Sequence, residues 1–251
     1  MAARLDHRHP PALFLADALG LDFLNSVATP VDTQVDWITD GDGLLAWLQQ
    51  ARLASAETLN DLRARTTSNE LDNVAAQARD LREWFRAFVR ARKGRTLTAG
   101  DLNDLSPLNR LLERDASFSR ITAGGTAAKA LEIRKTRHWQ APDSLLLPIA
   151  EVLATLVCEE NFANVKACEG PACTLLFADH TRGRVRRWCS MAICGNRAKQ
   201  AAHRSRARRP ASSPVPSDDP PHQPTVTRQA PQRSSRGRLR PKAKRRESHE
   251  N

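Results

Sequence analysis

The sequence predicts a mainly α-helical protein with a small β-hairpin element, followed by a short cysteine-paired module and a disordered tail. Three observations support this fold class. Apolar residues recur at helical intervals from about residue 12 to 163, four cysteines form two close pairs, and the composition changes sharply after Arg209. We therefore expect a helical domain over 12–163, a compact module over 164–209 and a disordered tail over 210–251.

The helical periodicity is clearest from Leu71 to Phe88, where apolar side chains recur every three or four residues and Gly94 supplies a stop signal. A further stripe runs from Leu145 to Val157. Asp42, Ser55 and Thr98 are candidate N-caps, because their side-chain oxygens can accept from free amides of the first turn. The shorter patterns predict helices over about 16–28, 42–53, 55–66 and 98–115.

A β-hairpin is predicted in the second half of the helical domain. The segments SFSRIT and ALEIRKTRHW alternate between apolar and polar residues, and Gly124-Gly125 between them is a turn signal. We expect a small element of two or three strands.

The N-terminal stretch ALFLADALGLDFLN does not have the pattern of an export signal, because Asp17 and Asp22 interrupt it. No run approaches the ~18 apolar residues of a spanning helix. We expect a cytoplasmic protein without a membrane partner, in which cysteines serve as thiols or metal ligands. Asp22 and Asn25, one helical turn apart, are interpreted as a solvated edge or a cap rather than a site.

The positive charge is concentrated in the C-terminal third. Residues 1–167 carry 20 Lys/Arg against 22 Asp/Glu, residues 168–209 carry 10 against 2, and residues 210–251 carry 9 against 4. A basic block beside a near-neutral body indicates a polyanionic partner, with nucleic acid before an acidic membrane surface. The tail from 210 has eight prolines and no aromatic residue, so it should not fold.

The cysteine pairs have metal-ligand spacing. Two C-x4-C pairs are separated by 15 residues, and four thiolates complete a tetrahedral Zn²⁺ shell. One structural zinc would staple a segment that is poor in apolar residues. The alternatives are two disulfides, four unrelated thiols, or a shell in which His180 or His203 replaces a cysteine. Four cysteines leave no open position for catalysis, so an enzyme is not expected. The predicted ligands are Cys168, Cys173, Cys189 and Cys194, whereas Cys158 lies on an apolar stripe and is expected to be buried.

A basic helix is predicted directly after the last cysteine. Asn196 is a natural N-cap, and helical spacing places Arg197, Arg204 and Arg208 along one face with Lys199 and Arg206 on its flanks. Folding around zinc would bring these residues beside the basic loop between the cysteine pairs. Phosphate and base edges would then be contacted by Arg182, Arg184, Arg186, Arg187, Arg197, Lys199, Arg204, Arg206 and Arg208.

The run CEGPACTLLFADHTRGRVRRWCSMAICGNRAKQAAHRSR closely resembles the CGNR zinc-finger module of bacterial proteins. Upstream, ADALGLDFLNSVATP and DWITDGDGLLAWLQQA are similar to the ABATE-type domain that precedes this finger. The resemblance covers about 12–209 and implies a stress-induced transcriptional regulator whose four cysteines bind zinc and whose finger binds DNA. Gly183 and Val185 depart from the polar residues common at these two positions of the family.

DNA is favoured over RNA as the partner, but an arginine-rich helix also suits A-form RNA. A third alternative is a protein-interaction module that docks an acidic partner, with Trp188, Met191 and Ile193 as its apolar anchor or as the small core of the finger. A small-molecule effector of the helical domain is suggested only by analogy with other two-part regulators. The sequence does not indicate an oligomeric state.

Overall fold

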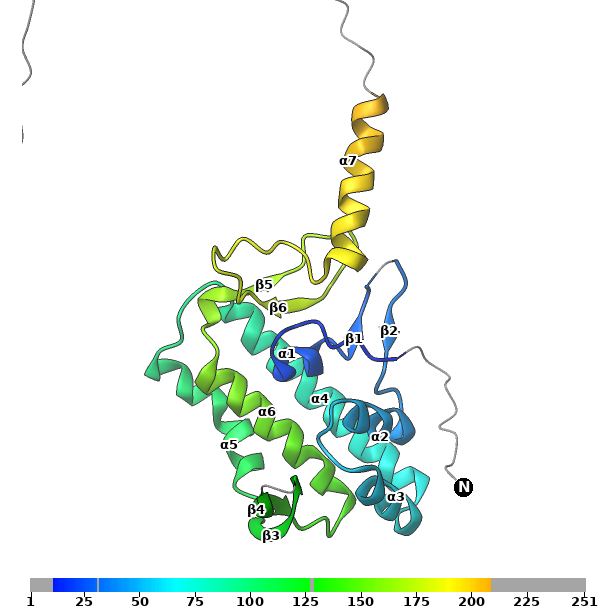
Figure 1. Ribbon diagram of the computed structural model, residues 1–251, viewed down its shortest axis with the longest axis vertical. Helices are drawn as coiled ribbons and strands as arrows, with labels where there is room; N and C mark the ends of the chain where they lie inside the picture. The colour runs from blue at the N-terminus through cyan, green and yellow to red at the C-terminus, as the bar shows by residue number, and fades with distance from the viewer. Residues whose placement is uncertain (1–10, 31, 127–128, 209–251) are drawn as a thin grey trace, which may run out of the picture. The chain divides into compact units, whose positions relative to one another are not determined.

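The computed structural model describes residues 11–30, 32–126 and 129–208, all within one compact unit. The predicted disordered tail, 210–251, lies outside the described residues. Figure 1 shows the arrangement of the helices and the small strand pairs. The helices are α1 (Leu19–Leu24), α2 (Gly41–Gln50), α3 (Ala56–Arg65), α4 (Ser68–Arg92), α5 (Ser106–Leu112), α6 (Leu146–Glu159) and α7 (Asn196–Arg208). The paired strands are β1 (Val27–Ala28) with β2 (Val35–Asp36), β3 (Ser117–Thr126) with β4 (Lys129–Arg137), and β5 (Val165–Ala167) with β6 (Leu176–Ala178).

The core forms where the shorter helices pack on the two long ones. α2 packs on α4, α5 packs on α6, and α1 contacts both long helices. Trp47 and Phe23 are fully buried, with ring centroids 5.4 Å apart in an edge-to-face arrangement. Gly20 lies where α1 meets α6, because a Cβ atom there would come within 2.9 Å of Leu156 Cβ. α1 also contacts β6, the strand that follows the first cysteine pair.

The starts of α2 and α3 follow local capping chemistry, and one of the two predicted caps needs correction. The Ser55 side chain accepts from the Thr58 amide at 3.1 Å, as predicted. Asp42 was predicted as the cap of the preceding helix, but this is wrong: α2 begins at Gly41, and the Asp40 side chain accepts from the Gly43 amide at 2.8 Å. Gly41 packs closely on Leu71, and Asp42 lies inside the first turn of α2.

The longest helix starts earlier than its apolar stripe. Thr67 caps α4 in a reciprocal box with Glu70, and the helix ends at Arg92, just before Gly94 with a φ of 84°. The segment predicted as one helix over 98–115 is divided. A 3-10 helix, η1 (Ala99–Leu105), leads into the short α5, with proline near its first turn.

The N-terminal helix is shorter than predicted. α1 covers Leu19–Leu24, and the chain then forms the β1–β2 pair. Asp22 and Asn25 are buried, so the expected solvated edge is wrong. Asp22 lies inside α1, and Asn25 follows its last residue. Asp22 Oδ1 accepts from the amides of Leu15 and Ala16 at 2.9 and 3.0 Å.

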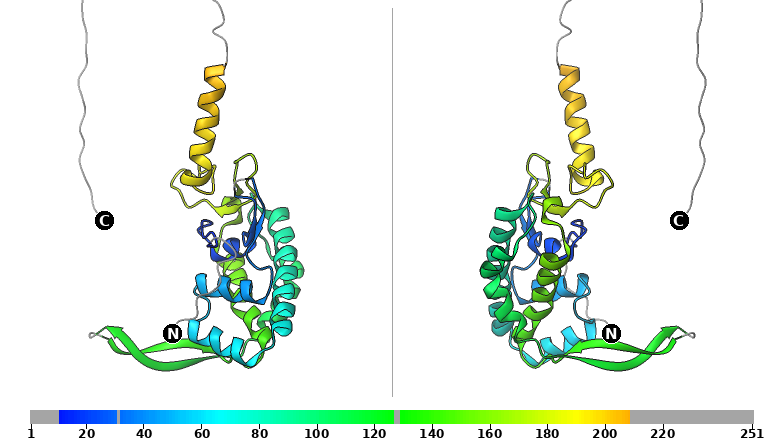
Figure 2. Two further views of the ribbon diagram at one scale, coloured as in Figure 1. Left: turned by 90° about the vertical axis from the view of Figure 1, so that its right-hand side faces the viewer. Right: turned by 90° about the vertical axis from the view of Figure 1, so that its left-hand side faces the viewer.

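The predicted hairpin is present and projects from the body, as Figure 2 shows. Its register places Arg120 opposite Arg134 and Ile121 opposite Ile133. Gly124 and Gly125, predicted as the turn, instead lie within β3, where the register shifts between Ala123 and Thr126. Residues 127–128, which connect the strands, lie outside the described residues. Glycine at an irregular strand position allows the local change in pairing.

α6 corrects one expectation about the cysteines. Its buried stripe includes Leu146, Ile149, Leu153 and Leu156. Cys158 falls off this stripe and is exposed, so the expected buried thiol is wrong. Among the described residues, no helix combines the length and the apolarity needed to cross a bilayer.

Candidate metal centre and basic helix

The first cysteine pair lies on the β5–β6 turn. Cys168 directly follows β5, and its amide donates to the Leu175 carbonyl at 2.9 Å. The Cys173 amide donates to the Gly170 carbonyl at 3.0 Å, which closes a tight turn between the two cysteines. A Cβ atom at Gly170 would lie 2.9 Å from Cys194 Sγ, so glycine is required where the two pairs meet.

The second pair leads into α7. The Ser190 side chain accepts from the amides of Ala192 and Ile193 at 3.1 and 3.3 Å, which starts the turn Met191–Gly195. Cys194 lies in this turn and is buried, as is Cys189 before it. α7 begins at Asn196, immediately after the turn, so the position of Cys194 sets the origin of the helix. The prediction of Asn196 as an N-cap is wrong, because Asn196 already has helical dihedral angles (φ −67°, ψ −38°) and Ser190 caps the preceding turn instead.

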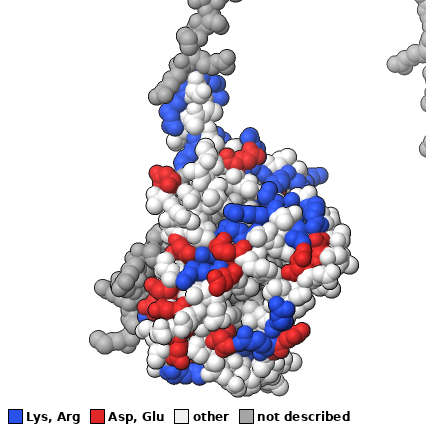
Figure 3. All heavy atoms as spheres, turned by 180° about the vertical axis from the view of Figure 1, so that it is seen from behind, with Lys and Arg blue, Asp and Glu red and all other residues white. Residues whose placement is uncertain are grey.

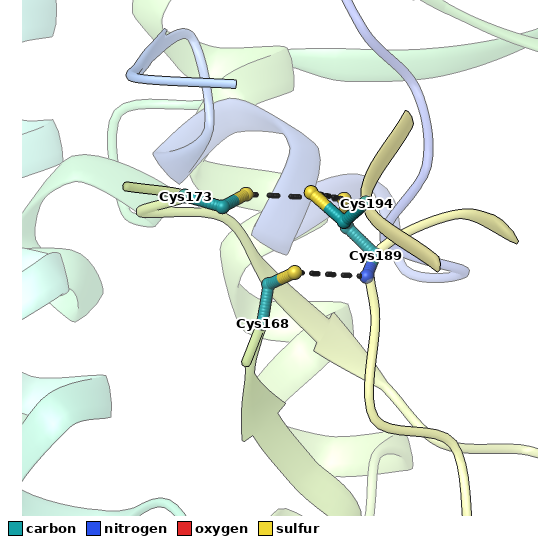
Figure 4. Close-up of side chains that lie close together, drawn as sticks. All are labelled: Cys168, Cys173, Cys189 and Cys194. Carbon is teal, nitrogen blue, oxygen red and sulfur yellow. Dashed lines mark hydrogen bonds between the residues drawn. The ribbon is translucent and has the colours of Figure 1, made fainter. Parts of the chain in front are cut away.

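The four sulfur atoms converge on one point (Figure 4). They all lie within 4.8 Å of one another. Cys189 Sγ lies 3.9 Å from Cys173 Sγ and 3.7 Å from Cys194 Sγ. These separations are far longer than a disulfide bond and match the ~3.8 Å edge of a tetrahedron of sulfurs about 2.3 Å from Zn²⁺. The cluster is compatible with one structural zinc ion, and neither His180 nor His203 belongs to it.

Backbone and side-chain donors surround the sulfurs. Cys168 Sγ accepts from the amides of Gly170 and Cys189 at 3.4 and 3.3 Å. Cys194 Sγ accepts from Arg197 Nη2 at 3.3 Å. N–H groups aimed at sulfur stabilise the thiolate form that a metal requires.

Crowding makes simultaneous ionisation of the thiols unfavourable. The hydrogen bond from Cys189 lowers the pKa of the Cys173 thiol to about 5. The same hydrogen bond and burial raise the pKa of Cys189, and burial raises that of Cys194 to about 11. One of the clustered thiols therefore ionises readily. Ionisation of the others is unfavourable unless a cation offsets the repulsion between the thiolates.

Asp179 organises the loop between the cysteine pairs. It is fully buried, and its carboxylate accepts from Lys166 Nζ at 2.7 Å and from the Arg186 amide at 3.0 Å. The Thr181 amide and hydroxyl donate to its other oxygen at 3.0 and 2.6 Å. Burial by itself would raise the pKa of Asp179, but these hydrogen bonds outweigh it and hold that pKa well below its usual range. In the sequence, Asp179 stands out only as the single acidic residue between the two cysteine pairs.

Arg186 is turned toward the helical domain. Its side chain is 17 % exposed and pairs with Asp17, and Nη2 donates to the Leu15 carbonyl at 2.8 Å. Nε donates to the Trp188 carbonyl at 3.0 Å, and the guanidinium carbon lies 4.3 Å from the centroid of the Phe177 ring. With its donors occupied in this way, Arg186 is placed to tie the finger to the N-terminal segment.

Three other predicted contact residues have partners within the protein. Arg184 donates to the Asp179 carbonyl, and Arg187 pairs with Glu169 at 2.6 Å on the surface. Arg197 Nη2 donates to the Pro30 carbonyl at 2.6 Å. Arg197 therefore lies at the root of α7 between the metal cluster and the β1–β2 loop.

The remaining basic side chains are exposed. Arg182, Lys199, Arg204 and Arg206 are exposed, and none of them forms an ion pair with another described residue. The side chain of Arg208 lies outside what the structure describes. At about 100° per residue, Lys199 and Arg206 lie half a turn away from Arg204 rather than on its flanks. Figure 3 shows basic atoms and no acidic atoms along the described part of α7.

Two further contacts of the finger, one by His180 and one by Thr174, were not predicted from the sequence. His180 Nε2 lies 2.9 Å from the Glu160 carboxylate at the end of α6. The Thr29 amide donates to Thr174 Oγ1 at 2.8 Å, beside the turn that carries Cys173. These contacts join residues far apart in the chain, so no local pattern predicts them.

Fold and site together define a helical protein with a four-cysteine zinc finger that carries a basic helix. Residues 17–160 match the ABATE family, described as "Putative stress-induced transcription regulator", and the chain belongs to this family. Residues 164–207 match the CGNR zinc finger, which confirms the resemblance noted from the motif. Neither description is that of an enzyme. No curated protein matches the chain.

Proposed function

We propose that this protein is a sequence-specific DNA-binding transcriptional regulator. The observation that carries the proposal is α7, which starts at the cysteine cluster and projects from the body (Figures 1 and 2). Its sequence NRAKQAAHRSRAR holds five basic residues and no acid. An exposed basic helix on a rigid root is suited to the phosphate backbone and to the major groove.

In this proposal, Cys168, Cys173, Cys189 and Cys194 hold one zinc ion, which supplies the cross-link that the small finger core lacks. The ion joins the β5–β6 turn to the start of α7. Residues 12–163 form the helical domain and 164–209 the finger. We place the protein in the cytoplasm, at the nucleoid when it is bound to DNA.

The exposed residues Arg182, Lys199, Arg204 and Arg206 contact DNA, with Arg208 as a fifth. Arg184, Arg186, Arg187 and Arg197 already bind partners in the protein, and we assign them no primary DNA contact. About five phosphate contacts correspond to a slope of about −4 to −5 for the logarithm of the binding constant against that of the salt concentration.

The test is fluorescence anisotropy with labelled duplex DNA at several salt concentrations, on zinc-loaded protein and after chelation. We expect salt-sensitive binding that is lost with the metal. The double variant Arg204→Ala/Arg206→Ala should bind at least tenfold more weakly, whereas Gln200→Ala on the same helix should not change affinity. Salt-independent binding, or equal loss in both variants, contradicts the proposal.

Two further arms separate the alternatives. If unlabelled structured RNA displaces the labelled DNA more effectively than unlabelled duplex DNA does, the partner is RNA rather than DNA. Retention of a partner protein after nuclease treatment, together with no nucleic-acid binding by zinc-loaded protein, would indicate an interaction module instead.

A further inference from the structure

The β3–β4 hairpin turns its polar face toward the body of the protein. Arg120, Thr122 and Arg134 line an open cleft of about 970 Å³ between the hairpin and the helices. The opposite face carries Ile121 and Ile133, which are 68 % and 75 % exposed. Hydrophobic burial alone would favour the reverse orientation, so the polar lining of the cleft needs another explanation.

The facing wall consists of the α2–α3 connection. Arg52, which follows α2, lies in the cleft lining together with Ser55 and Thr58 from the start of α3. Arg52 has a φ of 57°, a conformation that residues other than glycine rarely adopt. Trp139 and Val152 add apolar surface to the same cleft. Cationic groups from the hairpin and from the α2–α3 connection therefore line the cleft together with apolar side chains.

The positive charge of this cleft is only partly compensated. Arg134 pairs with Glu132, and Lys135 pairs with Glu151 at 2.7 Å. Arg52 and Arg120 make no ion pair with any described residue, although the Arg120 guanidinium carbon lies 5.5 Å from the centroid of the Phe118 ring. Arg120 is also directly opposite Arg134 in the hairpin, and like charges opposite one another destabilise a strand pair.

An unpaired hydroxyl adds to this picture. Thr122 Oγ1 is buried and has no hydrogen-bond partner, and Thr122 belongs to the cleft lining. The amino end of α3, a helix of 10 residues, contributes its positive dipole end to the facing wall. The arginines and this helix end favour negative charge, while Glu151, which also lines the cleft, is paired with Lys135 and Arg137.

We infer that this cleft binds a small organic anion. Arg52 and Arg120 recognise its acidic group, a carboxylate or a phosphate monoester, and its apolar part packs on Trp139 and Val152. The cleft volume is ample for a small molecule with one ring system. This inference is independent of nucleic-acid binding and extends the role of the helical domain.

The experiment is calorimetric titration of the zinc-loaded full chain with three probes that share one apolar part. The probes are 1-naphthoate, 1-naphthyl phosphate and the neutral 1-naphthalenemethanol. We expect at least one anion to bind and the alcohol not to bind, and the stronger of the two anions identifies the acidic group. Equal binding of the alcohol, or no binding of either anion at millimolar concentration, overturns the inference.

Variants locate the site. Arg120→Ala and Arg52→Gly should each weaken binding of the anion by about tenfold or more, the loss expected for one charge-assisted hydrogen bond. Glycine is chosen at position 52 because it suits the positive φ and so removes the guanidinium without straining the backbone. Arg110→Ala, an exposed arginine of α5 outside the cleft, is the matched control. Unchanged affinity in the Arg52→Gly protein overturns the inference even where Arg120→Ala perturbs the hairpin.

Discussion

Arg197 Nη2 lies 3.3 Å from the sulfur of Cys194, three residues earlier in the chain. The same nitrogen donates to the Pro30 carbonyl, and Nε donates to the Ile193 carbonyl at 2.8 Å. The arginine of the CGNR sequence thus joins a metal-ligand candidate, the turn that carries it and the β1–β2 loop. It is a positioning residue for the cluster and for the root of α7.

Arg197→Ala should lower zinc affinity by about tenfold, because the Cys194 thiolate loses a charged donor. Competition with a chromophoric chelator measures this affinity. Arg204→Ala, nine residues beyond the turn, should leave the zinc affinity unchanged while weakening DNA binding. Equal zinc affinities of the two variants would contradict the positioning role.

Gly170→Ala should impair the metal centre. The added Cβ would lie 2.9 Å from Cys194 Sγ and 3.1 Å from Cys173 Cβ. We expect substoichiometric zinc by elemental analysis of the purified variant. Gly183→Ala is the control, since its Cβ would meet only Val185 at an ordinary 3.6 Å; a normal zinc content in both variants would refute the prediction.

Arg186→Ala should destabilise the whole protein by about 2–4 kcal/mol, because it leaves the carbonyl groups of Leu15 and Trp188 without their donor. Urea unfolding followed by circular dichroism measures the loss. Arg182→Ala, from the same loop, should change the free energy of unfolding by less than about 0.5 kcal/mol. A comparable loss in both would mean that Arg186 is not the tie between the finger and the helical domain.

Asp22 gives stability a specific pH dependence. Burial raises its pKa to about 6, against the lowering effect of the Ala16 and Leu15 amides. Between about pH 4 and 6 the folded protein therefore binds a proton that the unfolded chain does not, so the unfolding free energy falls as the pH rises through this window. Compared with Asp22→Asn, the native protein should lose about 2 kcal/mol between pH 4.5 and 7.5. Parallel stability profiles of the two proteins would contradict this.

Local patterns predicted the features that depend on neighbouring residues. The stripe from Leu71 to Phe88 and the Ser55 cap follow from spacing within one helix, and the hairpin follows from alternation. The cysteine cluster was predictable for the same reason, since each pair spans only a short turn. Alternation shows that the β3–β4 hairpin has an apolar and a polar face. It does not show which face is turned toward the helices, so the inward orientation of the polar face was not predictable.

Tertiary contacts decided the rest. Asp40 and Asp42 are equivalent as caps in the sequence, but in the structure Asp40 caps α2, where Gly41 packs closely on Leu71. Arg186 resembles its basic neighbours in the sequence, yet it alone among them reaches Asp17, 169 residues away. Periodicity within a segment carries no information about such partners.

The pairing of Asn25 with Leu176 has a practical consequence for dissecting the protein. The Asn25 amide nitrogen donates to the Leu176 carbonyl at 2.8 Å, and its oxygen accepts from the Leu176 amide at 2.9 Å. The Ala178 amide donates to the Ala16 carbonyl at 2.8 Å. The Asn25 side chain and the Ala16 backbone thus form hydrogen bonds to β6 at the position that a third strand would occupy. A fragment that begins at residue 164 would leave this edge of β6 unpaired. Unpaired strand edges promote self-association, so the isolated fragment would be a poor substitute for the finger in the intact protein.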